Sequence, residues 1–165
     1  MNTNTDRIEK SILLRAPLER VWQAISDSGQ FGSWFGVAFD GPFVQGARLT
    51  GKIVPTTVDS EVAKLQQPHA GKAFMFEVDR IDPMHSISFR WHPFAVAQDV
   101  DYSKEPTTVI VFKLVAIGSD TQLKITESGF DQLPLSRRVD AFKANEGGWS
   151  LQVQLIQKFL AKQTS

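Results

Sequence analysis

The sequence feature that most constrains the fold is a pair of glycines inside the longest helical pattern. Residues 136–163 predict one helix, and Gly147 and Gly148 stand in its middle, directly before Trp149. Each glycine inside a helix costs about 1 kcal/mol relative to alanine. A chain that keeps both therefore predicts a close backbone approach, a kink or open space at this point. We expect a long helix laid across a sheet, with a cavity between them.

The N-terminal part predicts one strand followed by two short helices. Residues 8–14 predict the strand. Pro17 suits the first turn of a helix, where its missing N–H is not needed, and the helical spacing of apolar residues continues over 18–26. Residues 30–35 predict a second short helix rich in aromatic side chains.

The middle of the chain predicts strands joined by turns. Consecutive strands with tight turns favour an antiparallel sheet, and such a sheet needs a helix to cover one face. The predicted fold class is therefore α+β: a curved antiparallel sheet of about six strands that grips a long C-terminal helix, with two short helices after the first strand. A short helix is expected at 60–66, and the expected strands are 37–39, 47–54, 73–81, 86–91, 107–117 and 122–130.

Composition narrows the class of protein. The 165 residues predict a single domain over 1–165, with its core at about 8–162. The formal net charge of +0 argues against binding to nucleic acid. No apolar run approaches the ~18 residues of a membrane helix, so no membrane insertion is expected and the cytoplasm is the default location. The chain has no cysteine, and its three histidines lack ligand spacing, so neither a metal nor a cofactor is expected.

Alternation along the strands places many aromatic side chains on the inner face of the sheet. These rings have two interpretations: a well-packed core, or a cavity for a small hydrophobic or aromatic molecule. The entrance to such a cavity is expected near the second helix and the loops at 55–72 and 93–106. The residues predicted to line it are Trp34, Phe35, Phe74, Phe76, Phe89, Trp91, Phe112, Glu127, Asn145, Trp149 and Val153.

One acidic residue falls in the inner set of the last strand. Glu127 either points inward, where it must be paired or lose its charge, or lies at the strand end and reaches solvent. An enzyme of this chain would need a cavity acid or base. Glu127 and His92 are the candidate catalytic residues, with Asn145 as a possible orienting group. His92 is equally explained as a histidine at the cavity rim without a role.

Five segments give the chain a resemblance to a known family: residues 16–22 (APLERVW), 31–35 (FGSWF), 89–93 (FRWHP), 126–130 (TESGF) and 145–149 (NEGGW). The chain resembles homologues of the activator of the heat-shock protein 90 ATPase, within the START-like (SRPBCC) superfamily. The resemblance implies a helix-grip fold. It also implies that relatives bind lipids, sterols or polyketides, and that a few are cyclases or dehydratases. The eukaryotic co-chaperones carry a further N-terminal domain for which this chain has no room.

Three hypotheses follow. The favoured one is a noncatalytic START-like module that binds a small hydrophobic molecule between the sheet and the last helix. The second is an enzyme of cyclase or hydrolase type that uses Glu127. The third is a protein-interaction module, toward a chaperone or a second copy of the chain.

Overall fold

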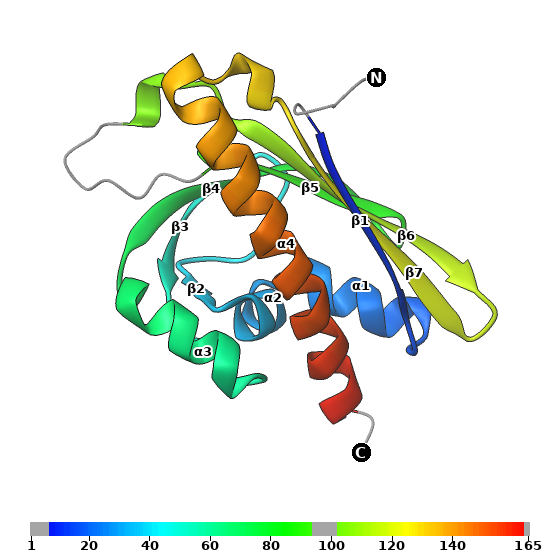
Figure 1. Cartoon of the computed structure of the whole chain (residues 1–165). Helices are drawn as coiled ribbons and strands as arrows, with labels where there is room; N and C mark the ends of the chain where they lie inside the picture. Colours follow the sequence, from blue (N-terminus) through cyan, green and yellow to red (C-terminus); the bar gives the residue numbers. More distant parts are fainter. Residues whose placement is uncertain (1–6, 94–101, 164–165) are drawn as a thin grey trace.

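The computed structural model describes residues 7–93 and 102–163. Within these residues, one long C-terminal helix follows a series of strands and three shorter helices (Figure 1). The elements are β1 (Arg7–Leu14), α1 (Leu18–Ser26), α2 (Ser28–Phe35), β2 (Val37–Phe39), β3 (Arg48–Ile53), α3 (Ser60–Gln66), β4 (Ala73–Asp82), β5 (Ser86–Trp91), β6 (Thr108–Ile117), β7 (Asp120–Ser128) and α4 (Leu135–Gln163).

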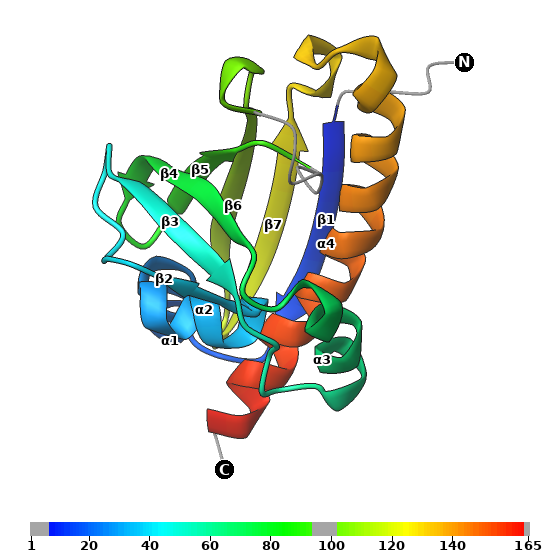
Figure 2. The same cartoon turned by 90° about the vertical axis from the view of Figure 1, so that its left-hand side faces the viewer.

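The strands form one antiparallel sheet in the order β1-β7-β6-β5-β4-β3-β2. The sheet curves, and α4 runs across its open face beside β1, with α1 and α2 below (Figures 1 and 2). The predicted α+β class, curved antiparallel sheet and long last helix are confirmed. The sheet has seven strands, against the expected number of about six, and the strands expected at 8–14 and 37–39 form its two edges as β1 and β2.

An aromatic core fills the space between the sheet and α2. Phe31 is fully buried and its ring lies 5.5 Å from that of Phe89 and 5.6 Å from that of Phe112. The indole N–H of Trp34 donates to the carbonyl oxygen of Ala24 at 2.9 Å, which ties α2 to α1. The buried indole is thus hydrogen-bonded as well as packed, as a buried polar group must be.

No helix in the described part of the chain is long and apolar enough to cross a membrane. The expected loop at 93–106 falls mainly on residues 94–101, which lie outside the described residues.

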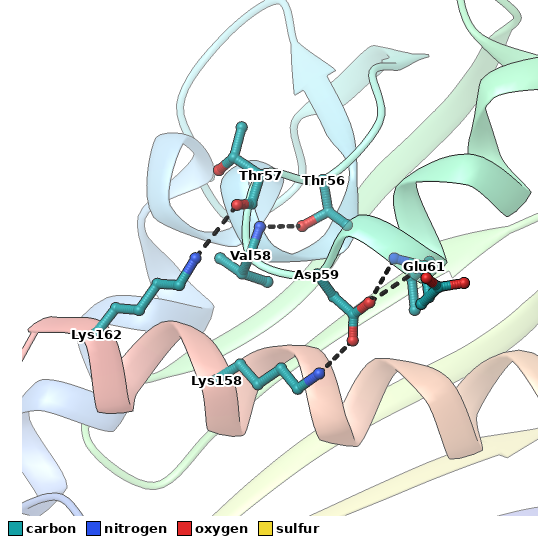
Figure 3. A network of polar contacts seen from close by, with 8 residues as sticks. Thr56, Thr57, Val58, Asp59, Glu61, Lys158 and Lys162 are labelled. Carbon is teal, nitrogen blue, oxygen red and sulfur yellow. Dashed lines mark hydrogen bonds and ion pairs between the residues drawn. The ribbon is translucent and has the colours of Figure 1, made fainter.

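Charged side chains fasten α3 to the C-terminal half of α4 (Figure 3). Asp59 caps α3 by accepting hydrogen bonds from the backbone N–H groups of Glu61 and Val62, at 2.9 and 3.1 Å. Its other oxygen forms an ion pair with the ammonium of Lys158. The Lys158 ammonium, helped by the Val62 N–H, holds the pKa of Asp59 below its ordinary value of 3.8.

Substitution of Asp59 by asparagine tests this attachment. Asparagine is an equally good N-cap, so Asp59→Asn removes the charge and keeps the cap. Because the folded pKa is lowered, the stabilisation is fully present above the unfolded value of 3.8 and is lost as the pH falls through the folded pKa. We expect Asp59→Asn to lower the free energy of unfolding at neutral pH, and the deficit to vanish in acid.

Urea unfolding at a series of pH values measures this deficit. Lys158→Met should show the same dependence on pH, since it removes the other partner of the pair. A deficit that stays constant down to low pH would show that the ion pair contributes nothing.

Candidate ligand-binding site

A pocket of about 470 Å³ lies between α4, α3, the end of α2 and the neighbouring strands. Apolar side chains make up most of its wall. The residues that line it are Phe35, Gly36, Val37, Ile53, Val62, Leu65, Gln66, His69, Lys72, Ala73, Phe74, Trp91, His92, Ala144, Asn145, Gly148, Leu151 and Gln152. Its size and apolar character are typical of pockets that hold a small molecule.

The glycine pair of α4 lies beside this pocket. A Cβ atom added at Gly147 or Gly148 would meet no other atom within 4 Å. Gly148 lines the pocket, whereas Gly147 is exposed on the outer side of the helix. Of the three explanations that the sequence left open, the structure shows open space.

A smaller recess of about 60 Å³ shares five lining residues with the main pocket, Gly148 among them, and has Trp149 on its own wall. Three rings border it. The centroid of Phe35 lies 6.2 Å from that of Trp91 and 5.9 Å from that of Trp149, and the two tryptophan rings are 6.0 Å apart. These spacings lie in the range of favourable ring contacts. The three rings thus contact one another around the recess and form an aromatic box.

Glu127 lies behind these rings and is completely buried. Each indole N–H points at it: Trp91 Nε1 donates to Oε2 at 2.7 Å, and Trp149 Nε1 donates to Oε1 at 2.8 Å. The Thr108 hydroxyl lies 2.5 Å from Oε2, and the amide nitrogen of Asn145 lies 2.9 and 3.1 Å from the two oxygens. Of the two positions weighed from the sequence, Glu127 takes the inward one.

This hydrogen-bond network joins four elements. Glu127 comes from β7, Trp91 from β5, Thr108 from β6, and Asn145 and Trp149 from α4. Asn145 and Trp149 are four residues apart, so they share one face of the helix. A buried carboxylate needs several donors to offset its loss of water, and here both oxygens have them. The network thus fixes how α4 sits on the sheet.

The structure separates the predicted cavity residues into three groups. Phe35, Phe74, Trp91 and Asn145 line the main pocket, and Trp149 lines the recess. Glu127 stands behind them. The others, Trp34, Phe76, Phe89 and Phe112, are completely or almost completely buried in the aromatic core, and Val153 packs against that core. For these five the packed-core interpretation holds.

The segment 55–72, which contains α3, was expected at the cavity entrance, but none of its residues was among those predicted to line the cavity. Val62 and Leu65 face the pocket, and Gln66 braces the wall: its Oε1 accepts from Thr56 N at 2.8 Å, and its Nε2 donates to Phe35 O at 3.0 Å. The helical spacing at 60–66 predicted the helix, but not which of its side chains would face the pocket. His92, the other catalytic candidate, lines the pocket. Within the described residues, no cluster of histidine and acidic side chains could hold a metal ion.

Comparison of the chain with known proteins identifies one matching family and a set of solved structures with the same fold. The family model described as "Activator of Hsp90 ATPase homolog 1-like protein" matches residues 15–161. No curated protein sequence matches the chain significantly.

Several solved structures share the fold at low sequence identity. Protein MLL2253 from Mesorhizobium loti is 18% identical with a TM-score of 0.68, over 94% of this chain and 97% of that one. The Aha1 dimer from Colwellia psychrerythraea is 18% identical with a TM-score of 0.62, over 92% of each chain. DynU16, from the dynemicin biosynthetic locus, is 22% identical with a TM-score of 0.66, over 94% of this chain. This chain spans about half of its length, 47%.

Replacement of Glu127 by glutamine tests the network. The new amide group would turn two N–H donors toward groups that are themselves donors. Because an unsatisfied buried donor costs about 1–3 kcal/mol, we expect Glu127→Gln to lower the free energy of unfolding by about 2 kcal/mol or more. Urea unfolding followed by tryptophan fluorescence measures the loss. Glu146→Gln, on the exposed side of α4, is the matched control and should leave stability unchanged. Equal stability of the two variants would contradict the structural role of Glu127.

Proposed function

The chain belongs to the family of activator of Hsp90 ATPase homolog 1-like proteins, and we propose that it is a noncatalytic domain that binds a small hydrophobic or aromatic molecule in the pocket beside Gly148. The observation that carries this proposal is the open space over Gly148. Any larger residue except proline would strengthen the helix at this point, and its side chain would enter the pocket.

The chemistry of the walls supports binding of an apolar molecule. Aromatic rings from α2, β4 and β5 form one side of the pocket. Leu65 of α3 and Leu151 of α4 also line it. Both leucines are exposed to solvent, at 63% and 37%. A ligand that covers such side chains gains the hydrophobic free energy of the area that it removes from water.

The hydrogen bonds of Glu127 support binding over catalysis. A general acid or base needs an oxygen within reach of the substrate. Both oxygens of Glu127 are engaged by side chains of β5, β6 and α4, and the carboxylate has no exposed surface. Its role in this proposal is to hold Trp91 and Trp149 in place.

Filling the pocket from the helix tests the proposal directly. Gly148→Leu should fold at least as stably as the parent, because leucine is the better helix former by about 0.8 kcal/mol, and its side chain should fill part of the pocket beside the aromatic rings. We expect the affinity for the neutral probe N-phenyl-1-naphthylamine, measured by its fluorescence, to fall at least about tenfold, or about 1.4 kcal/mol. The control is Gly147→Leu, one residue away on the exposed side, which should bind the probe like the parent.

Two results would contradict the proposal. One is a parent protein that does not bind the probe. The other is an equal effect of the two leucine variants, which would place the probe elsewhere. Thermal unfolding of both variants shows that loss of binding does not come from loss of the fold.

Self-association is a second candidate property, favoured by the outer face of the sheet. Leu13 of β1 and Val115 of β6 lie on either side of Gln122, and both are about half exposed, at 47% and 49%. The relative from Colwellia psychrerythraea is described as a dimer.

Light scattering after size exclusion should show a concentration-dependent dimer that Val115→Lys abolishes. Val44→Lys, on an exposed loop residue elsewhere, should leave it intact. A parent protein that is monomeric at all concentrations would exclude it.

A further inference from the structure

The ionisable side chains that line the pocket are all basic. Among its described lining residues, the ionisable ones are His69, Lys72 and His92, and no aspartate or glutamate is present. A charge beside low-dielectric walls acts on a ligand more strongly than the same charge on an open surface. The pocket therefore favours a ligand with a negative group.

Lys72 is the permanent cation of this set. It stands directly before β4, half-buried, and its Nζ lies 3.0 Å from Nδ1 of His69. An ammonium can only donate, so the Nδ1 atom accepts and adds no negative charge. Other lysines, such as Lys64 and Lys124, form ion pairs with glutamates. No carboxylate of the described residues lies within ion-pair distance of Lys72.

The position of Lys72 relative to the rings sets the direction of a ligand. Phe74 follows two residues later, and both residues line the pocket. The Phe74 ring lies 6.2 Å from that of Trp91, which borders the inner recess. A charged group at Lys72 would thus continue into an apolar body that runs over Phe74 toward the aromatic box.

We propose that the ligand is an aromatic or apolar anion, such as a carboxylate, whose negative group is bound by Lys72 and whose apolar body lies against Phe74 and Trp91. This assignment rests on the proposed function and adds the chemical class of the ligand. The histidine beside Lys72 supplies a second donor when its other ring nitrogen carries the proton.

Two probes with the same aromatic skeleton test the assignment. 8-Anilinonaphthalene-1-sulfonate carries a negative group, and N-phenyl-1-naphthylamine lacks it. In Lys72→Met the affinity for the anionic probe should fall about tenfold, because a hydrogen bond to a charged group is lost. The affinity for the neutral probe should stay within about twofold. Raising the concentration of KCl should lower the affinity of the parent protein for the anionic probe, but should not change the affinity of Lys72→Met for it.

The controls separate this assignment from the proposed function. Lys64→Met removes a lysine of α3 that does not line the pocket, and Lys72→Arg keeps the charge; both should bind the two probes like the parent. If Lys72→Met binds both probes like the parent while Gly148→Leu still excludes them, the anion assignment is wrong and the pocket proposal stands. If Gly148→Leu excludes neither probe, both proposals fail.

Discussion

The hydrogen bonds to Glu127 are the interaction on which the rest of the site depends. One buried carboxylate receives donors from two strands of the sheet and from α4. Its desolvation is offset only when these donors are in place, so the arrangement is cooperative. Because the two indole N–H groups must point at the same carboxylate, the rings of Trp91 and Trp149 are held side by side. The walls of the inner recess are therefore a consequence of the network.

The pocket exists because α4 has no side chain at Gly148, which lines it. The helix buries Trp149, Ile156 and Leu160 on its inner side, yet it places a glycine where it passes the recess. The glycine pair costs roughly 2 kcal/mol of helix stability, and the long apolar interface of α4 offsets this cost. The opposite wall, α3, is held by a separate set of contacts through Asp59 and Gln66. The residues that leave the pocket open are therefore different from the residues that attach α3 to the rest of the protein.

The sequence predicted the elements better than the site, for a physical reason. Helical spacing and turn residues are local, so the helices at 18–26 and 60–66 begin and end where they were expected. Strand alternation assigned Phe89 and Trp91 to one face. It could not predict depth: Phe89 is completely buried, whereas Trp91 reaches the pocket near the end of β5. The partners of Glu127 depend on the register of three strands and on the docking of α4, which no local pattern contains.

In the proposed complex, Glu127 behind the recess and Lys72 on the pocket wall would together set the orientation of an anionic ligand. Glu127 is electron-rich and lies behind the rings at the inner end, while Lys72 lines the main pocket and not the recess. An anionic group placed beside the recess would lie near the carboxylate in a medium of low dielectric constant, where like charges repel strongly. The same group at Lys72 gains attraction and leaves the apolar body to the aromatic box. In the proposed complex, the carboxylate that organises the recess would therefore also select the orientation of an anionic ligand, without touching it.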